Sequence, residues 1–292
     1  MKNQPGTLGH LMHTRGMSLE EAFSYALEDP SDAKLPASSK SGFRQPWGVQ
    51  EYEIRDGALC NTNRAVRTRY FFPVLAKELP ERLVKIHEGN EADLLRFAKR
   101  YGQLGHDLLV RNEDRRYGDP LPWIWTHVRS VRACMSLIEK IQTDDLDGLQ
   151  DFFAAHKTLD IALRGQIKPL VWGSVTSNFR SVALWIVQNI INPNIAGIHR
   201  VIDIGEANGP YRSFFTHSAL IEMVYWHLAD AIDGGTVKRC SSAGCGAYFI
   251  ATDRRQRFCS PDNPKTESPC SIRERVRRFR KAKKKHTKRR TG

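Results

Sequence analysis

The sequence predicts a mainly α-helical protein with minor β-hairpins, in which a helical N-terminal domain precedes a small domain organised around cysteines. Three observations lead to this prediction. Apolar residues recur at helical spacing through much of the chain from residue 91 to residue 233. Four of the six cysteines lie within the last 53 residues. The same segment ends in an almost purely basic stretch, which separates it in composition from everything before it.

Residues 1–48 are predicted to be a loosely ordered segment and linker. A capping box at Ser18–Glu21 favours one short helix, and residues 29–47 are rich in the Pro, Ser, Lys and Gly typical of linkers. Residues 49–236 are predicted to form a helix-rich domain. Its first part contains short β-type runs, Tyr70–Phe72 and Leu83–Val84, which favour one or two hairpins.

Five helices are expected in this domain, because apolar residues recur every three or four positions. The first begins at Glu91 and ends at Gly102, since glycine commonly terminates helices. The third starts at Leu146, with Thr143 as its predicted cap. The second helix has the clearest stripe, formed by Ile124, Val128, Val131, Met135 and Ile138.

The fourth helix, through Val182 and Ile190, has apolar residues on nearly all faces and is expected to be almost surrounded by protein. Pro193 is expected to stop it. A β-hairpin is predicted over residues 201–215, with its turn at residues 208–210. The fifth helix runs from Ile221 to Ile232 and ends before two glycines.

Cys240, Cys245, Cys259 and Cys270 have the spacing of a metal site, with four, thirteen and ten residues between successive cysteines. In a reducing compartment, clustered cysteines hold metal more often than they form disulfides. Four thiolates satisfy Zn²⁺ tetrahedrally and leave no position open for a substrate. The prediction is therefore one structural Zn²⁺. Free or redox-active thiols are the alternative, and Asp262 or Glu267 in place of one thiolate is another.

The residues around these cysteines predict a treble-clef-like zinc finger with a basic helix over residues 237–281, followed by a basic tail over residues 282–292. Ala247–Ile250 and Gln256–Phe258 are expected to form a hairpin. A capping box at Ser271–Glu274 predicts a helix start directly behind the last cysteine. The apolar stripe of this helix is expected to pack on aromatic residues of the hairpin: Ile272, Val276 and Phe279 on Tyr248, Phe249 and Phe258.

Charge is segregated along the chain. Residues 237–292 hold 18 Lys and Arg against four acids, a net charge of +14, whereas residues 1–236 sum to −1. Between Ser271 and Gly292, twelve Lys and Arg accompany one acid. A basic block of this kind is typical of a surface that binds phosphates. The alternative is a solvated helix face with a disordered tail, which leaves the segregation unexplained.

The residues predicted to contact nucleic acid are the cations of the finger loop and the basic helix: Arg254, Arg255, Arg257, Arg273, Arg275, Arg277, Arg278, Arg280, Lys281 and Lys284. Arg273 and Arg277 share one helical face, where they can reach guanine edges or phosphates, which carry no sequence information. The sequence does not choose between these contacts. DNA is the favoured partner, and RNA stays open because the aromatic residues of the finger can stack on bases instead of filling its core.

From Cys240 onward, over about 50 residues, the chain resembles the CGNR-type zinc fingers of bacterial proteins that carry an ABATE-like, stress-related helical regulatory domain in front. The matching residues are Cys240-x4-Cys245-Gly246-x2-Phe249, the arginines at 254, 255 and 257, Phe258-Cys259-Ser260, and Cys270 followed by Arg273 and a basic helix. Where that signature has Gly-Asn-Arg, this chain has Ser271-Ile272-Arg273. The resemblance implies a four-cysteine zinc site and a DNA-binding regulator.

Two hypotheses of function follow. In the first, the protein is a bacterial DNA-binding transcription regulator whose helical domain senses a ligand or forms a homodimer. In the second, it is an interaction protein that binds RNA, or nucleic acid in general, without reading sequence.

We do not expect an enzyme. The chain has no nucleophile-elbow, His-Glu-x-x-His, phosphate-loop or Gly-x-Gly-x-x-Gly motif, and Trp123 and Trp125 are interpreted as core anchors. No secretory signal or membrane span is predicted, so we expect a cytoplasmic protein associated with the nucleoid.

Overall fold

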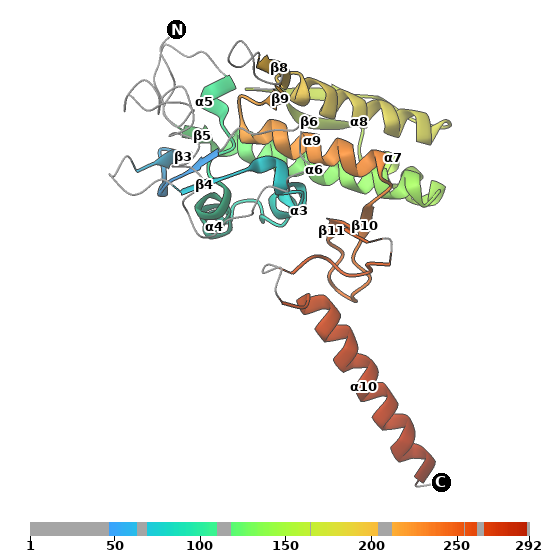
Figure 1. The fold of residues 1–292 in the computed structure, drawn as a ribbon. Helices are drawn as coiled ribbons and strands as arrows, with labels where there is room; N and C mark the ends of the chain where they lie inside the picture. Colours follow the sequence, from blue (N-terminus) through green and yellow to red (C-terminus); the bar gives the residue numbers. More distant parts are fainter. Residues whose placement is uncertain are drawn as a thin grey trace.

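The computed structural model describes residues 47–62, 69–109, 118–163, 165–203, 212–253, 255–261 and 266–290 (Figure 1). The helix predicted behind Ser18, the N-terminal linker, the turn at residues 208–210, Arg254 and Asp262 lie outside these residues. The described helices are η1 (Pro73–Leu75), α3 (Leu79–Val84), α4 (Glu91–Tyr101), α5 (His106–Leu109), α6 (Leu121–Gln142), α7 (Leu146–Ala155), α8 (Phe179–Ile195), α9 (Leu220–Asp233) and α10 (Pro269–Arg290).

The strands of the described residues form small antiparallel sheets between the helices. The three-stranded sheet has the order β2-β3-β5, and the other pairs are β1 with β4, β6 with β7, β8 with β9, and β10 with β11. Their bounds are β1 (Trp47–Val49), β2 (Tyr52–Arg55), β3 (Ala58–Asn61), β4 (Arg69–Phe71), β5 (Gly118–Pro120), β6 (Thr158–Leu163), β7 (Gln166–Val171), β8 (His199–Asp203), β9 (Arg212–Thr216), β10 (Val237–Arg239) and β11 (Tyr248–Ile250).

Helix α6 is the centre of the large core. It packs against α3, α7, α8 and α9, and also against β6 and β10. The predicted apolar stripe of α6 is confirmed, because its residues from Ile124 to Ile138 are fully or almost fully buried. Trp123 and Trp125 are buried as well, as expected of core anchors. The core that α6 organises extends from Leu59 to Val237, so it reaches the first residue of β10.

The other predicted helices are present, with two corrections at their ends and one concerning burial. Asp145, not Thr143, caps α7, and its carboxylate accepts the Gly148 N–H at 2.9 Å. Pro193 lies inside the last turn of α8 and does not stop it. The Asn194 amide ties that turn to β6 by donating to the carbonyls of Ala162 and Ile190. In addition, α8 is not surrounded, since Leu184 and Trp185 are about 40% exposed.

Two further corrections concern strands. Leu83 and Val84 belong to α3, whose six residues are all buried. A short buried apolar run does not distinguish a helix from a strand, which explains the error. The β6–β7 hairpin was not predicted, although residues 158–161 of β6 alternate between polar and apolar residues. Pro169 obscured the second strand, because proline is unusual inside a sheet.

A buried histidine links α6 to α9. His127 is fully buried, and its Nδ1 lies 2.9 Å from the Tyr225 hydroxyl. Burial, with a smaller contribution from His106, lowers the pKa of His127 to about 3. In the unfolded chain this side chain takes up a proton near pH 6.5. Between these pH values the unfolded state binds one more proton than the folded state, so acidification favours unfolding.

We therefore predict that the free energy of unfolding falls as the pH drops below about 6.5, by up to about 1.4 kcal/mol per pH unit from His127. Denaturant unfolding at several pH values should show a smaller slope for His127→Gln than for the wild type. The exposed residue His199 supplies the control, His199→Gln, which should keep the wild-type slope. An unchanged slope in His127→Gln would contradict this assignment.

Candidate metal centre and basic helix

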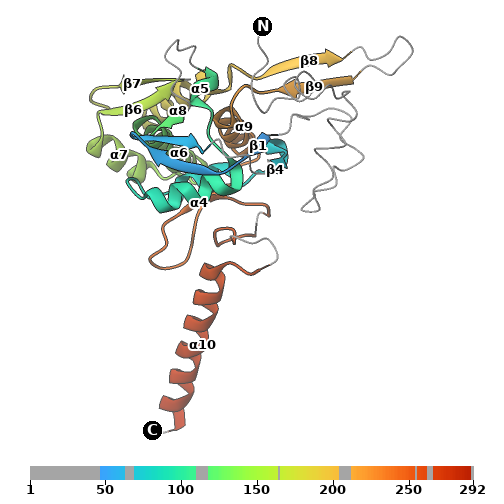
Figure 2. The ribbon, with the colours of Figure 1, turned by 90° about the vertical axis from the view of Figure 1, so that its left-hand side faces the viewer.

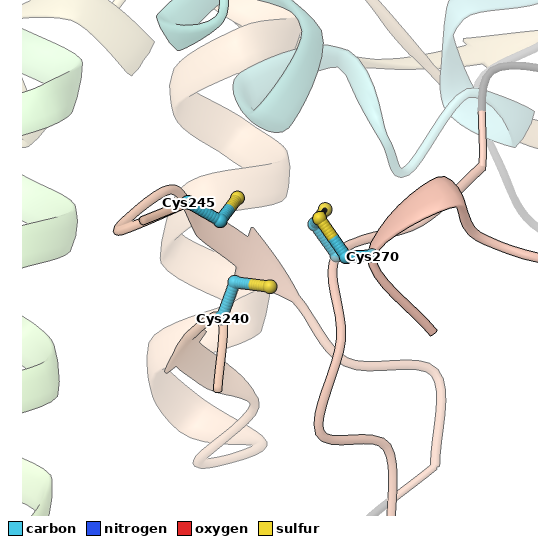
Figure 3. A group of neighbouring side chains, drawn as sticks. Cys240, Cys245 and Cys270 are labelled. Atoms are coloured by element: carbon cyan, nitrogen blue, oxygen red, sulfur yellow. Dashed lines mark hydrogen bonds between the residues drawn. The ribbon is translucent and has the colours of Figure 1, made fainter. Parts of the chain in front are cut away.

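The four clustered cysteines meet in space. The sulfurs of Cys240, Cys245, Cys259 and Cys270 all lie within 4.8 Å of one another, and those of Cys259 and Cys270 are 3.6 Å apart. Figure 3 shows the sulfurs of Cys240, Cys245 and Cys270 directed into one common space. Thiolates at 2.3 Å from a tetrahedral ion lie about 3.8 Å from each other. The four side chains are therefore positioned to bind a single metal ion.

Local backbone structure fixes the positions of the Cys240 and Cys245 sulfurs. The Cys240 N–H donates to the Ala247 carbonyl, and the Cys245 N–H donates to the Ser242 carbonyl, which closes a tight turn around the site. Gly244 and Gly246 have φ values of 77° and 60°. These left-handed conformations favour glycine, so the small residues around Cys245 follow from the turn geometry.

The other two sulfurs come from separate segments. Cys259 lies in the loop behind β11, and Cys270 lies in the first turn of α10. The fully buried Phe249 packs beside the cluster, together with Ala251. Glu267, considered above as a replacement ligand, is not part of the described cluster and pairs with Arg275 at 2.9 Å. The ten residues that separate Cys259 from Cys270 are thus compatible with a four-sulfur site.

The thiols differ in their acidity. Burial acts to raise the pKa of Cys245, but hydrogen bonds from the Ala247 backbone and the other thiols outweigh it, so this pKa is lowered. Burial raises the pKa of Cys259 and of Cys270. The Cys270 thiol adds to that effect at Cys259, and the Cys245 thiol adds to it at Cys270. A bound metal ion displaces such protons, because only thiolates act as ligands. Cys134, outside the cluster, is a buried thiol of the large core.

The cysteine cluster is docked on α3 of the helical region. The fully buried Glu81 accepts the N–H of Ser260, which directly follows Cys259, at 3.1 Å. Lys85 donates to the same carboxylate at 2.8 Å and to the Ser260 carbonyl at 3.3 Å. Arg82 donates to the Pro261 carbonyl. Sequence reasoning missed these residues, since a Glu and a Lys four positions apart are common on helices.

The predicted packing inside the finger is wrong in two respects. Gln256–Phe258 is not a strand, and β11 pairs with β10 instead. The apolar stripe of α10 does not cover the aromatic residues: Ile272, Val276 and Phe279 are 40%, 41% and 69% exposed. Tyr248 packs against the large core, where its hydroxyl donates to Ser136 at 3.0 Å. The helix is therefore free of the interface that its stripe was expected to make.

Helix α10 projects away from the rest of the molecule in both views (Figures 1 and 2). It begins at Pro269, so Ser271 is not its cap, and the Ser271 hydroxyl donates to Glu267 instead. The helix continues through Arg290 and thus includes most of the predicted tail. Lys284 lies on this helix.

The cations of α10 from Arg273 to Lys281 are all exposed, and they fall into two groups. Arg277 makes two hydrogen bonds to Glu274 at 2.8 and 2.9 Å, Arg278 makes one to the same carboxylate, and Arg275 pairs with Glu267. The second group has no ion pair or side-chain hydrogen bond with another described residue: Arg273, Arg280 and Lys281. Arg255 and Arg257 lie elsewhere, at a hollow beside β10.

Comparison of this chain with protein-family models, with curated proteins and with solved structures gave no match. Within the described residues, no helix has both the length and the apolar character needed to cross a membrane.

The cluster predicts binding of one divalent metal ion per chain. Serine at Cys240 or Cys270 should abolish stoichiometric binding, because three thiolates and a hydroxyl hold the ion far more weakly. Titration with Co²⁺, followed by its thiolate absorption bands, measures this. Cys60→Ala removes a thiol outside the cluster and should leave the stoichiometry at one. Full occupancy in the Cys270→Ser variant would contradict the four-sulfur assignment.

Removal of the Glu81 carboxylate should weaken metal binding, although Glu81 is not itself a metal ligand. Glu81→Ala leaves the Ser260 N–H without its acceptor and Cys259 less well oriented, so we expect about 10- to 100-fold weaker metal binding. Competition with a chromophoric chelator gives the affinity. Glu88→Ala is the matched control, because Glu88 is an exposed acid near the same helix that pairs with Arg129. Equal affinities for the Glu81 and Glu88 variants would contradict this role.

Proposed function

We propose that this protein is a zinc-dependent nucleic-acid-binding protein, and that its partner in the cell is double-stranded DNA. The observation that carries the proposal is α10, a 22-residue helix that stands away from the body and presents exposed cations between Arg273 and Lys281. A helix of this length spans about 33 Å, and the major groove of B-DNA admits an α-helix. The charge segregation along the chain supports the same partner.

Zinc is the metal that fits the donor set best. Four thiolates with no oxygen or nitrogen ligand select zinc or iron–sulfur chemistry over hard cations. A four-sulfur zinc site is closed, so its role is structural. We further infer a treble-clef-like finger, in which the tight turn at Cys240–Cys245 supplies two ligands and the start of α10 supplies the last. The motif-level resemblance to CGNR-type fingers supports this inference.

Phosphate contact fits α10 better than base contact. Arg277, one of the two residues considered for guanine recognition, has its guanidinium engaged by both oxygens of Glu274. Exposed ion pairs of this kind contribute about 1 kcal/mol or less, so phosphates can compete for the arginine, but it is not prearranged for a base edge. The cations without a partner, Arg273, Arg280 and Lys281, are available to phosphates at once.

DNA is preferred over single-stranded RNA because the aromatic residues of the finger are occupied. Phe249 is fully buried, Tyr248 packs against the large core, and Phe258 packs against the cysteine cluster. None of them stands as an open stacking platform for a base. The second candidate function, RNA or non-specific nucleic-acid binding, keeps one exposed aromatic residue in its favour, Phe279 of α10.

The way the finger joins the helical region supports a regulatory role. Glu81 and Arg82 of α3 hold the backbone next to Cys259, and Tyr248 reaches α6. In the proposed regulator, a ligand or a second copy that changes the packing of α3 or α6 therefore alters the position of the finger. The domain over residues 49–236 would be the sensing part, and residues 237–281 the binding part.

We predict that the full-length protein binds duplex DNA with a salt dependence set by the cations of α10. The variant Arg273→Gln/Arg280→Gln/Lys281→Gln should lower the slope of log K against log salt by about 0.9 for each lost contact. Fluorescence anisotropy between about 50 and 200 mM salt measures the slope. The control Lys157→Gln/Lys168→Gln/Arg180→Gln removes the same charge from exposed positions of the helical region and should bind as the wild type does.

Sequence selectivity decides between the two candidate functions. Selection from a pool of genomic fragments at about 150 to 200 mM salt should enrich particular sequences if the protein is a regulator. Uniform capture of all fragments supports the non-specific alternative. Absence of binding by the wild type at the lower salt concentration would exclude both.

A further inference from the structure

A second basic surface lies beside the metal centre, apart from α10. It is a hollow of about 510 Å³ lined by four cations, one hydroxyl and one amide: Lys238, Arg239, Ser241, Arg255, Gln256 and Arg257. Two segments of the chain form it, namely β10 with the turn after it and the loop before Cys259. The sequence indicated Arg255 and Arg257, whereas only the fold adds Lys238 and Arg239.

The two walls of the hollow are held together by hydrogen bonds to main-chain carbonyls. The Ser241 N–H donates to the Arg257 carbonyl at 2.9 Å, and Lys238 Nζ donates to the Gln256 carbonyl at 3.3 Å. Gln256 in turn accepts the Thr252 N–H at 2.9 Å, which closes the loop on itself. Ser241 is next to the ligand Cys240, and Arg257 is two residues before the ligand Cys259. The shape of the hollow is therefore tied to the cysteine cluster.

The positive charge of this hollow is balanced only in part, because Arg239 interacts electrostatically with Glu139 of α6 and no carboxylate lines the hollow. Arg239, Arg255 and Arg257 are exposed, and none of their guanidinium groups makes a hydrogen bond or an ion pair with another residue that the structure describes. The Asp253 carboxylate accepts the main-chain N–H of Arg255, not its side chain. On α10, by contrast, three arginines already have carboxylate partners.

The chemistry of the lining identifies the ligand class. Guanidinium groups offer paired N–H donors that match the oxygens of a phosphate, and a serine hydroxyl adds a further donor. The lining contains no carboxylate to hold a cation and no large apolar side chain to hold a hydrophobic ligand. The volume lies in the range of sites for small molecules, about 300 to 1,000 Å³, and so exceeds what a single phosphate needs.

We propose that this hollow binds consecutive phosphates of a nucleic-acid backbone and is a second anchoring point besides α10. This inference rests on the proposed nucleic-acid-binding function. The direct contacts are supplied by Arg239, Arg255 and Arg257. Lys238 of β10 adds a further positive charge to the lining of the hollow. With α10 it gives the protein two separated phosphate-binding surfaces, which position the finger on the backbone without reading bases.

The test uses the full-length, metal-loaded protein and the variant Arg239→Gln/Arg255→Gln/Arg257→Gln. We expect the slope of log K against log salt for duplex DNA to fall by about 2 to 3, because each lost phosphate contact removes about 0.9. The variant Arg239→Lys/Arg255→Lys/Arg257→Lys keeps the charges and should retain most of the slope. Unchanged metal content and unchanged thermal unfolding show that each variant is folded. The charge-matched control on the helical region, Lys157→Gln/Lys168→Gln/Arg180→Gln, should keep the wild-type slope.

The outcomes separate this inference from the proposed function. If the α10 variant loses salt dependence and the hollow variant does not, the hollow is not an anchoring point, while nucleic-acid binding stands. If the wild type binds no nucleic acid, both proposals fail. Calorimetry with inorganic pyrophosphate distinguishes a free anion from a backbone. Pyrophosphate binding that the hollow variant loses, with an unchanged DNA slope, would overturn the backbone assignment in favour of a small-anion site.

Discussion

The convergence of four sulfurs is the constraint on which the C-terminal region depends. The buried apolar residues that surround the cluster among the described residues are few, chiefly Phe249 and Ala251. A core of this size does not hold a loop and a long helix in place by hydrophobic burial, since small domains commonly need a metal or disulfides. In the proposed metal-bound protein, the free energy of metal binding would contribute directly to the free energy of folding. The start of α10 and the hollow beside β10 both owe their position to the same centre.

The metal centre is also joined to the helical region by polar contacts that water does not reach easily. Glu81 is fully buried, and one of its oxygens receives both Lys85 and the Ser260 N–H. A buried carboxylate is costly unless it is paired and hydrogen-bonded, so α3 and the loop behind Cys259 stabilise each other. The finger is consequently oriented relative to α3 and α6 while α10 extends outward.

Much of the helical region could be predicted from the sequence, because helical periodicity is strong where one face is buried. The stripe from Ile124 to Ile138 is an example. The four cysteines were predicted to meet from their spacing along the chain instead. The failures have physical reasons as well. Periodicity does not reveal the partner of a stripe, so Ile272, Val276 and Phe279 were assigned to an interface that α10 does not make. Likewise, Lys238 and Arg239 become part of a basic hollow only when β10 pairs with β11.

X-ray absorption at the zinc edge of the purified, full-length protein tests the central claim most directly. The account predicts one zinc ion per chain with four sulfur neighbours at about 2.3 Å. A first shell containing nitrogen or oxygen at about 2.0 to 2.1 Å, or protein that carries no metal and remains fully folded, would contradict it.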